Sequence, residues 1–386
     1  MKPKLLIFSN VYPRSLTPNT GFYVRDQILQ LKEFFEIKMI VATPVRSLKK
    51  RLVTREYIDG IEVIQPDYRT VPKIGVFFSA GNYERAAAGI VDDLYKEFPF
   101  EMIVSYWTYP EGYAAGRLAR KYRVPLVIRP RGSDINLFVS KPGLRFLIKR
   151  SLKRADKVIP NAESVLRKIR SLGISEKKSL YILNGVNTRE FHHMSMDACR
   201  KNLDFAEGKK YILFIGNFRP VKGVDFILEA IKRLDREQRS VLRFIFLGSG
   251  PQEQLIRETA KELRAVNIRI IGDVPHDRLV VWMNAANLLC LPSLNEGCPN
   301  VVMEAMSCGL PVVASRVGAV PELINDPELG VVVPPGDVDA LADGIVKGVH
   351  TGWRRDKMMD RVKELDWPRV ARRLRDEFMK LMVDKV

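Results

Sequence analysis

The segment YILFIGNFRPVKGVDFILEAIKRL, residues 211–234, decides the fold. It begins with YILFIGNF (211–218), an apolar run that predicts a buried strand, and ends with VDFILEAIKRL (224–234), which has the apolar spacing of an amphipathic helix. The turn between them carries glycine and proline, residues that favour a change of chain direction. A buried strand followed directly by a helix is typical of α/β proteins, in which helices cover both faces of a parallel sheet.

The same alternation occurs in both halves of the chain, whose 386 residues are enough for two domains. We therefore predict two Rossmann-like doubly wound domains, residues 1–188 and 189–366, facing a central cleft, with a helix over 367–386 that packs back on the first domain. Ligands of such sheets bind beyond the carboxyl ends of the strands. The other strand-like runs are KLLIFS (4–9), EIKMIVA (36–42), MIVSYW (102–107), PLVIRP (125–130), RFIFLGSG (243–250), IRIIGDV (268–274), ANLLCLPS (286–293) and LPVVAS (310–315).

The positive charge of the chain is concentrated in its first half. The formal net charge is +18; residues 1–190 contain 34 basic and 18 acidic residues, whereas residues 191–386 contain 29 and 27. This asymmetry indicates that the first half meets an anionic membrane surface, a phosphorylated substrate or nucleic acid, or that it has a solvated basic surface. Nucleic acid is disfavoured as a partner because no nucleic-acid-binding motif accompanies the charge.

Apolar runs and cysteines narrow the class of protein further. No run reaches the ~18 residues that span a bilayer, and the N-terminal sequence lacks a signal-peptide pattern. We expect a cytoplasmic protein, with peripheral association at the inner face of the membrane as an option. The four cysteines show no CxxC spacing and no clustering with histidine, so we expect free, mostly buried thiols rather than disulfides or a structural metal site.

A second decisive stretch is EGCPNVVME, residues 296–304. We expect a helix to begin at Pro299, so that Asn300 and Val301 present unpaired amides to a phosphate. Glu296 and Glu304 then suit sugar hydroxyls on either side of a diphosphate. Taken alone, two glutamates at this separation also fit a solvated face.

The glycine turn GNFRPVKG (216–223) places two cations, Arg219 and Lys222, at the end of a strand. Glycine allows the backbone to approach a ligand closely, and the cations suit a phosphate; the alternative is a simple turn with a solvated lysine. FLGSGP (246–251) and GDVPH (272–276) follow strands in the same way. None of these turns fits a Walker loop or a GxGxxG fingerprint, which disfavours ATP hydrolysis and NAD binding.

Four motifs in this order, RPRGSD (129–134), YILNGVN (181–187), GNFRPVKG and EGCPNVVMEAMSCGLPVVAS (296–315), resemble those of the retaining nucleotide-sugar glycosyltransferases of family four, which have the GT-B fold. The resemblance covers essentially the whole chain. It implies transfer of a sugar, with retention of configuration, from a UDP- or GDP-linked donor to a glycan, lipid-linked or small-molecule acceptor. None of these four motifs contains an Asp-x-Asp metal pair, so we expect no required metal, and no cofactor.

The resemblance also implies roles for individual residues. Glu304 would hold the nucleotide ribose, Glu296 the donor sugar, and Lys222 the leaving diphosphate. Many members have arginine where this chain has Asn217, and whether Arg219 replaces that charge stays open. The predicted catalytic residues are Lys222, Arg219, Glu296 and Arg131, and the predicted donor-binding residues are Gly21, Phe22, Gly216, Asn217, Gly250, Val274, Gly297, Cys298, Pro299, Asn300, Val301 and Glu304.

In the first half, the resemblance places the loop NVYPRSLTPNTGFYVRDQ (10–27), with Gly21 and Phe22, near the donor. Gly21 is equally explained as a turn residue. Arg131 stands where the family often has histidine. It would hold a donor hydroxyl or an anionic acceptor, or form a structural ion pair with Asp134.

The segment KPGLRFLIKRSLKRADK (141–157) carries seven basic residues and one acidic residue. On a helix, Leu144, Leu147, Ile148 and Leu152 form an apolar stripe opposite Lys149, Arg150, Lys153 and Arg154, which fits docking on an anionic membrane as well as an ordinary core-facing helix. VRSLKKRLVTREYI (45–58) is a second basic stretch. The competing functions are a GT-B epimerase or phosphorylase, and a non-catalytic, membrane-associated nucleotide-sugar-binding protein in which Lys222 and both glutamates are dispensable.

Overall fold

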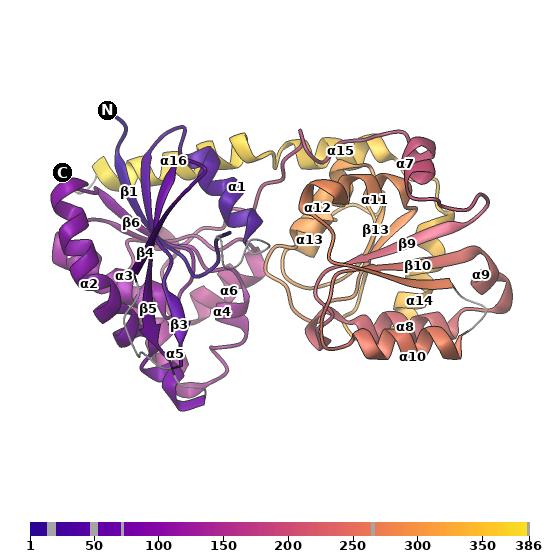
Figure 1. The fold of residues 1–386 in the computed structure, drawn as a ribbon, viewed down its shortest axis with the longest axis horizontal. Coiled ribbons are helices and arrows are strands. Elements are labelled where there is room, and N and C mark those ends of the chain that lie inside the picture. Colours follow the sequence, from indigo (N-terminus) through magenta and orange to yellow (C-terminus); the bar gives the residue numbers. More distant parts are fainter. Residues whose placement is uncertain (14–20, 47–52, 71–72, 264–266, 384–386) are drawn as a thin grey trace. The chain divides into compact units, whose positions relative to one another are not determined.

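The computed structural model describes residues 1–13, 21–46, 53–70, 73–263 and 267–383, and the chain forms two compact units (Figure 1). Unit 1 comprises Met1–Asn184 and Trp367–Val386, and unit 2 comprises Gly185–Asp366. The chain thus enters unit 2 after Asn184, whereas the sequence analysis placed the boundary after residue 188. Parts of the predicted donor loop (14–20) and of the second basic stretch (47–52) lie outside the described residues.

Unit 1 is built on a sheet with the strand order β3-β5-β2-β1-β6-β7-β8, in which β4 pairs antiparallel with β5 and the other pairs are parallel. Because β1 lies between β2 and β6, the chain reverses its direction of travel across the sheet at β1. Ligands of doubly wound sheets bind at such a reversal, beyond the strand ends. The strands are β1 (Lys4–Phe8), β2 (Glu36–Ile40), β3 (Thr43–Val45), β4 (Val53–Ile58), β5 (Ile61–Arg69), β6 (Met102–Ser105), β7 (Leu126–Ile128) and β8 (Lys157–Val158).

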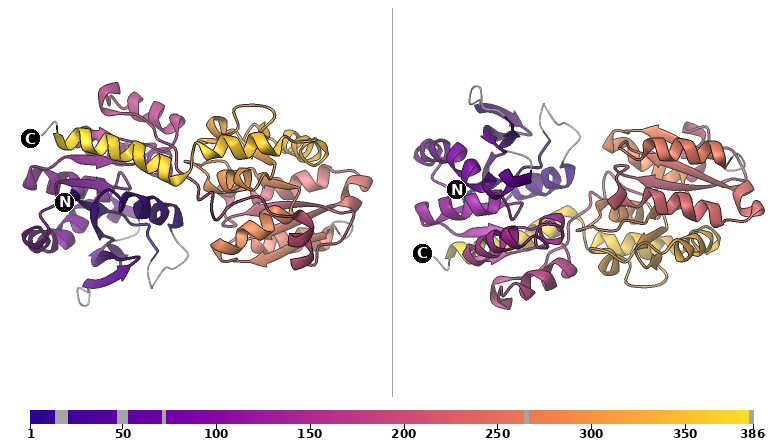
Figure 2. Two further views of the ribbon diagram at one scale, coloured as in Figure 1. Left: turned by 90° about the horizontal axis from the view of Figure 1, so that it is seen from above. Right: turned by 90° about the horizontal axis from the view of Figure 1, so that it is seen from below.

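Helices cover both faces of this sheet (Figure 2). One face packs against α1 and α16, whose apolar residues join those of the strands in one buried cluster. On the other face α3 packs against α2 and α5. The helices are α1 (Phe22–Leu31), α2 (Ser79–Glu97), α3 (Glu111–Tyr122), α4 (Ser133–Asn136), α5 (Pro142–Arg154), α6 (Glu163–Ser171) and α16 (Trp367–Val383), with 3-10 turns η1 (Lys73–Phe77) and η2 (Glu176–Lys178).

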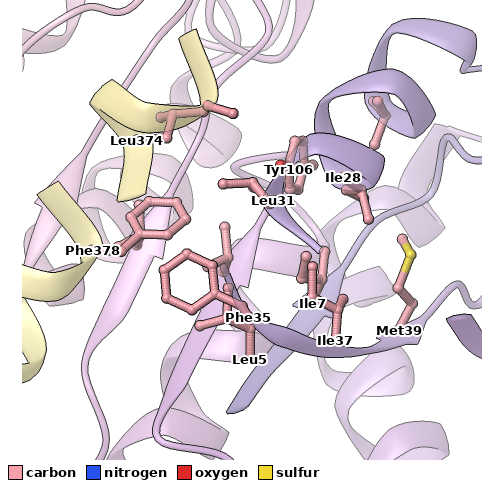
Figure 3. Close-up of a cluster of buried hydrophobic side chains, with 14 of the residues drawn as sticks. Leu5, Ile7, Ile28, Leu31, Phe35, Ile37, Met39, Tyr106, Leu374 and Phe378 are labelled. Carbon is pink, nitrogen blue, oxygen red and sulfur yellow. The ribbon is translucent and has the colours of Figure 1, made fainter. Parts of the chain in front are cut away.

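The C-terminal helix α16 belongs to the core of unit 1. Figure 3 shows Leu374 and Phe378 of this helix beside Phe35 and Leu5, and the rings of Phe35 and Phe378 lie 6.1 Å apart. All four side chains are at most 1% exposed. Burial of each such side chain stabilises by roughly 1.5–3 kcal/mol, so several of them together hold the helix on unit 1.

Unit 2 has a parallel sheet with the strand order β11-β10-β9-β12-β13-β14. Here the reversal falls between β9 and β12. The predicted strands are therefore found, and the glycine turn after β9 lies at the reversal. The strands are β9 (Lys210–Ile215), β10 (Leu242–Leu247), β11 (Asn267–Gly272), β12 (Leu288–Leu291), β13 (Val312–Ser315) and β14 (Val331–Val333).

The helices of unit 2 also lie on both faces of the sheet (Figure 1). The apolar sides of α8, α10 and α14 form one buried cluster with β9 and β10, while α11, α12 and α13 lie on the opposite side in Figure 1. The helices are α7 (Met196–Asn202), α8 (Val224–Arg233), α9 (Arg236–Val241), α10 (Glu253–Glu262), α11 (Leu279–Ala285), α12 (Asn300–Ser307), α13 (Val320–Leu323), α14 (Val338–His350) and α15 (Arg355–Lys363), with 3-10 turns η3 (Pro220–Lys222) and η4 (His276–Arg278).

Two sequence predictions need correction in detail. Pro299 is the N-cap of α12 rather than its first residue, because its ψ of 102° is extended, and the helix begins at Asn300. In α5, the apolar stripe is not free to enter a membrane, because Leu144, Ile148 and Leu152 are completely buried in the protein. The cysteines agree with the prediction, since all four are free and buried.

Candidate active site

The loops that follow β9 and β12 touch at the carboxyl edge of the unit 2 sheet. Gly223 has a φ of +72°, and a Cβ atom at this position would lie 2.2 Å from the carbonyl oxygen of Pro292. Only glycine fits both the left-handed backbone and this close approach. The glycine that ends the predicted phosphate turn therefore brings Lys222, next to it in sequence, against the loop that leads to α12.

Lys222 and Glu296, predicted from separate motifs, are paired. The Lys222 Nζ atom donates to Glu296 Oε1 at 2.7 Å, and the hydroxyl of Ser293 donates to the same oxygen at 2.7 Å. The Lys222 side chain is 28% exposed and that of Glu296 10%. The ammonium group is thus fixed in position at the strand reversal but can still be reached from solvent.

Glu304, on α12, belongs to a second charged group. His276, which follows β11, lies with Nε2 3.2 Å from Glu304 Oε1 and with Nδ1 3.4 Å from Glu190 Oε1. Burial opposes protonation of this imidazole, but hydrogen bonds to Glu190 and Glu304 outweigh it and raise the pKa of His276 to about 10. At neutral pH His276 is therefore an imidazolium that holds both carboxylates in place.

The turn before α12 is packed closely against the loop after β13. Gly297 accepts a hydrogen bond from the Ala319 amide at 2.7 Å. A Cβ atom on Gly318 would lie 2.3 Å from the Gly297 oxygen. Within α12 the Val302 amide already donates to Pro299, so Asn300 and Val301 are the residues whose amides begin the helix.

The other predicted donor-binding residues of unit 2 lie at neighbouring strand ends. Gly216 and Asn217 follow β9, and Asn217 is exposed, as is Arg219. Gly250 follows β10, and a Cβ there would lie 2.8 Å from the Phe218 amide nitrogen. Val274 follows β11 and is half-buried, and Cys298 is buried beside Pro299.

Unit 1 contains the remaining predicted site residues. Gly21 is the N-cap of α1 with a φ of 79°, and Phe22 is the first residue of that helix. A Cβ on Gly21 would lie 2.8 Å from the Val11 carbonyl carbon, so the close approach seen here is to the chain itself. Arg131 is only 6% exposed, and its guanidinium donates to Asn184 Oδ1 at 2.9 Å and to Gln27 Oε1 at 3.2 Å.

Several site residues were missed by the sequence analysis. His276 ends the GDVPH turn, and its position directly after a strand was the signal available; Glu190 and Ser293 have no motif of their own. In unit 1, Arg129 begins the RPRGSD motif and Tyr106 follows β6. Both are completely buried at the carboxyl edge of the sheet.

We expect His276→Gln to destabilise unit 2 in a pH-dependent way. The pKa of His276 is raised from 6.5 to about 10, so its contribution is fully present below about pH 6.5 and is lost as the pH rises through 10. Loss of these charge-assisted hydrogen bonds is worth on the order of 2 kcal/mol. Thermal unfolding from pH 6 to 10.5 should show a large difference from wild type that shrinks towards the alkaline end. His350→Gln, exposed at the end of α14, is the matched control; a pH-independent difference for His276→Gln would contradict the assignment.

Two family models match the chain in sequence. Residues 38–190 match the model described as Glycosyltransferase Family 4, and residues 195–364 match Glycosyl transferases group 1. The two-unit α/β architecture and these matches define a glycosyltransferase with the GT-B fold. The chain belongs to glycosyltransferase family 4.

Similar proteins agree with this class. The putative teichuronic acid biosynthesis glycosyltransferase TuaC of Bacillus subtilis (strain 168) is 26% identical over 366 residues, which are 90% of this chain and 89% of that protein. The N-acetyl-alpha-D-glucosaminyl L-malate synthase of Bacillus anthracis is 25% identical over a stretch that includes 73% of this chain and 74% of that protein. Among solved structures, HepE of Anabaena in complex with UDP-glucose has a TM-score of 0.74 at 17% identity, covering 97% of this chain and 99% of that one.

Across the described ranges, none of the helices is both long and apolar enough to cross a bilayer. Among the same residues, no group of three or more His, Cys, Asp or Glu side chains is arranged to hold a metal ion.

Proposed function

We propose that this glycosyltransferase moves a sugar from a UDP- or GDP-linked donor to an acceptor with retention of configuration and without a metal or another cofactor. The observation that carries the proposal is the Lys222–Glu296 pair at the strand reversal of unit 2. An ammonium held at such a place, beside the first amides of α12, suits a diphosphate leaving group. HepE, which has the same fold, was solved with UDP-glucose.

In this proposal the residues of unit 2 divide the donor between them. Lys222 and the exposed Arg219 stabilise the negative charge that develops on the departing diphosphate. The Gly297–Val301 backbone lies along the phosphate and the sugar, and Glu296 accepts hydrogen bonds from sugar hydroxyls. Glu304, held by the His276 imidazolium, accepts from the ribose hydroxyls. In unit 1, Gly21, Phe22 and Arg131 serve the donor sugar and the acceptor.

A panel of nucleotide sugars tests this function. Thermal unfolding with UDP- and GDP-linked hexoses should identify one donor that stabilises the protein. Incubation with that donor should release the nucleoside diphosphate, and proton NMR of the product should show the anomeric configuration of the donor. Inversion of the anomeric centre would overturn the retaining mechanism, and release of a sugar phosphate would favour a phosphorylase.

We further propose that the acceptor is presented at an anionic membrane surface in the cytoplasm, which α5 helps unit 1 to reach. With its apolar stripe buried, the outward side of this helix carries Arg145, Phe146, Arg150 and Lys153. Phe146 is 63% exposed, although it is a large apolar side chain. Exposed aromatic groups among cations are typical of surfaces that bind membranes.

Two more exposed aromatic residues extend this surface. Phe78 is 65% exposed and Phe77 41%. Phe77 lies against the start of α5, where a Cβ on Gly143 would come within 2.6 Å of its ring. The surface is therefore a basic helix face that carries Phe146, with Phe77 at the start of the helix and Phe78 next to Phe77 in sequence. Arg154, in contrast, lies over the Tyr113 ring at 5.1 Å, so it also contributes to the structure of unit 1.

We expect replacement of Arg145, Lys149, Arg150 and Lys153 by glutamine to abolish vesicle binding. Each cation near an anionic leaflet contributes ~1 kcal/mol, and salt screens this attraction beyond ~8 Å at physiological ionic strength. In vesicle sedimentation, binding should rise with the fraction of anionic lipid and fall with salt. Glutamine at Lys201, Arg236 and Lys261, exposed in unit 2, is the control. Equal binding to neutral and anionic vesicles, or no binding, would leave the charge as a solvated surface.

A further inference from the structure

Two arginines lie together at the carboxyl edge of the unit 1 sheet. Arg129 directly follows β7, and its amide donates to Ser105 of β6 at 2.8 Å, which continues the sheet by one residue. Arg131 is two residues further on. Both guanidinium groups lie close to the ring of Tyr106, with the guanidinium carbons of Arg129 and Arg131 at 6.0 and 4.6 Å from the ring centre.

Arg129 has an unusual environment for an arginine. Its side chain is completely buried, and none of its guanidinium nitrogens has a hydrogen-bond partner among the residues that the structure describes. Tyr106, also buried, has no partner for its hydroxyl in the same described residues. Figure 3 shows Tyr106 near Leu31 and Ile28 of α1, so this polar group borders the apolar core.

A buried guanidinium without a partner is costly. Removal of such an ion from water costs several kcal/mol, and a second arginine nearby adds repulsion. The pKa of Arg129 is lowered to about 9, mainly by burial and to a smaller extent by the charge of Arg131, and it is still above neutral pH. Arg129 therefore remains cationic at neutral pH beside the Arg131 guanidinium and requires compensation by negative charge.

Among the described residues of unit 1, the nearby polar groups do not supply that charge to Arg129. Arg131 donates to the neutral amides of Asn184 and Gln27 and lies 5.4 Å from the centre of the Tyr23 ring. The carboxylate of Asp134 accepts from the Arg131 and Gly132 amides and from the amide and hydroxyl of Thr108. The chain thus holds this carboxylate to its own backbone.

We infer that Arg129 and Arg131 form a binding site for an anionic group, a carboxylate or a phosphate, and that the acceptor carries this group. The assignment to the acceptor rests on the proposed function; the anion site itself does not. Guanidinium groups bind both anions through paired hydrogen bonds. The site lies beside the strand reversal of unit 1, where doubly wound sheets bind ligands, and Arg131 keeps 6% of its surface exposed.

Thermal unfolding with inorganic phosphate or malonate tests the anion site on the full chain. At constant ionic strength in chloride, phosphate or malonate should raise the Tm of the wild type by about 3–5 °C at ten times the half-saturating concentration. Arg129→Met should lose this response and, without anions, melt no lower than wild type, because an unpaired buried charge has gone. Arg120→Met, exposed on α3, should respond like wild type. An equal rise in Tm for wild type and Arg129→Met would overturn the assignment of the anion site. If Arg129→Met does not fold, Arg129→Lys is measured in its place.

Transfer assays then show whether the anion that binds at Arg129 is a group of the acceptor or a free ion. With acceptors in matched pairs, acidic and neutral, Arg129→Lys should raise KM for the acidic member at least tenfold and leave KM for the nucleotide sugar within twofold. No preference for the acidic member, with phosphate still bound, would overturn the assignment to the acceptor. If no nucleotide sugar is turned over at all, the proposed function fails, whereas the loss of phosphate binding in Arg129→Met would still support the anion site.

Discussion

Lys222→Ala should lower turnover by ~10²–10³ while the protein stays folded, because removal of one preorganised group that stabilises developing charge has an effect of this size. Lys222 is well suited to that role, since its Nζ is held 2.7 Å from Glu296 Oε1 and the loop that carries it packs on Pro292. The measurement is steady-state transfer from the donor identified in the nucleotide-sugar panel.

Two controls make the Lys222 result specific. Lys232→Ala removes a lysine from α8 that pairs with Glu229 on the surface, and it should keep normal turnover. Unfolding of Lys222→Ala must also be measured, because the change leaves the largely buried Glu296 without its cation. A folded Lys222→Ala protein with near-normal turnover would defeat the assignment of Lys222 to the diphosphate.

Glu304→Gln and Glu296→Gln should have different effects, although the two residues come from one short motif. Glu304→Gln should weaken binding of the free nucleoside diphosphate about tenfold, because an amide presents a donor where the ribose needs an acceptor. Glu296→Gln should leave that affinity within twofold and lower transfer of the intact donor. Calorimetry with the nucleoside diphosphate and transfer assays with the nucleotide sugar measure the two effects separately.

The structure gives a reason for this division. Glu304 is held by the imidazolium of His276, whereas Glu296 is held by Lys222 and Ser293. Glu229→Gln, on the exposed side of α8, is the control for the loss of a carboxylate. Equal losses of nucleoside diphosphate affinity in both variants would contradict the separate roles.

The strands and most helices could be predicted from the sequence because their signals are local. Apolar runs such as residues 211–218 have no stable conformation other than a buried one, and the periodic segment 224–234 fits only a helix with one buried side. The observed β9 and α8 follow these segments within a few residues. The start of α12 was misplaced by one residue, because the ψ of Pro299 depends on its surroundings and not on its ring.

The candidate site was only partly visible in the sequence. Lys222, Glu296 and Glu304 stand in recognisable motifs, and the strand ends that carry them were predicted. His276 and Glu190 are 86 residues apart in sequence, from 190 to 276, and nothing local indicates that they meet. The basic segment 141–157 was recognised by composition, but composition did not reveal that Leu144, Ile148 and Leu152 face the core while Phe146 faces outward.

The sequence by itself determined the two α/β units, the family and the residues at the strand ends, because hydrophobic periodicity and short motifs act between near neighbours. Only the tertiary structure decided which charges are paired. Lys222 meets Glu296, His276 is held between two carboxylates, and Arg129 is buried beside Arg131 without a carboxylate of its own in the described residues. The energy of a charge depends on its distance from other charges and from water, and folding sets both distances by bringing remote segments together.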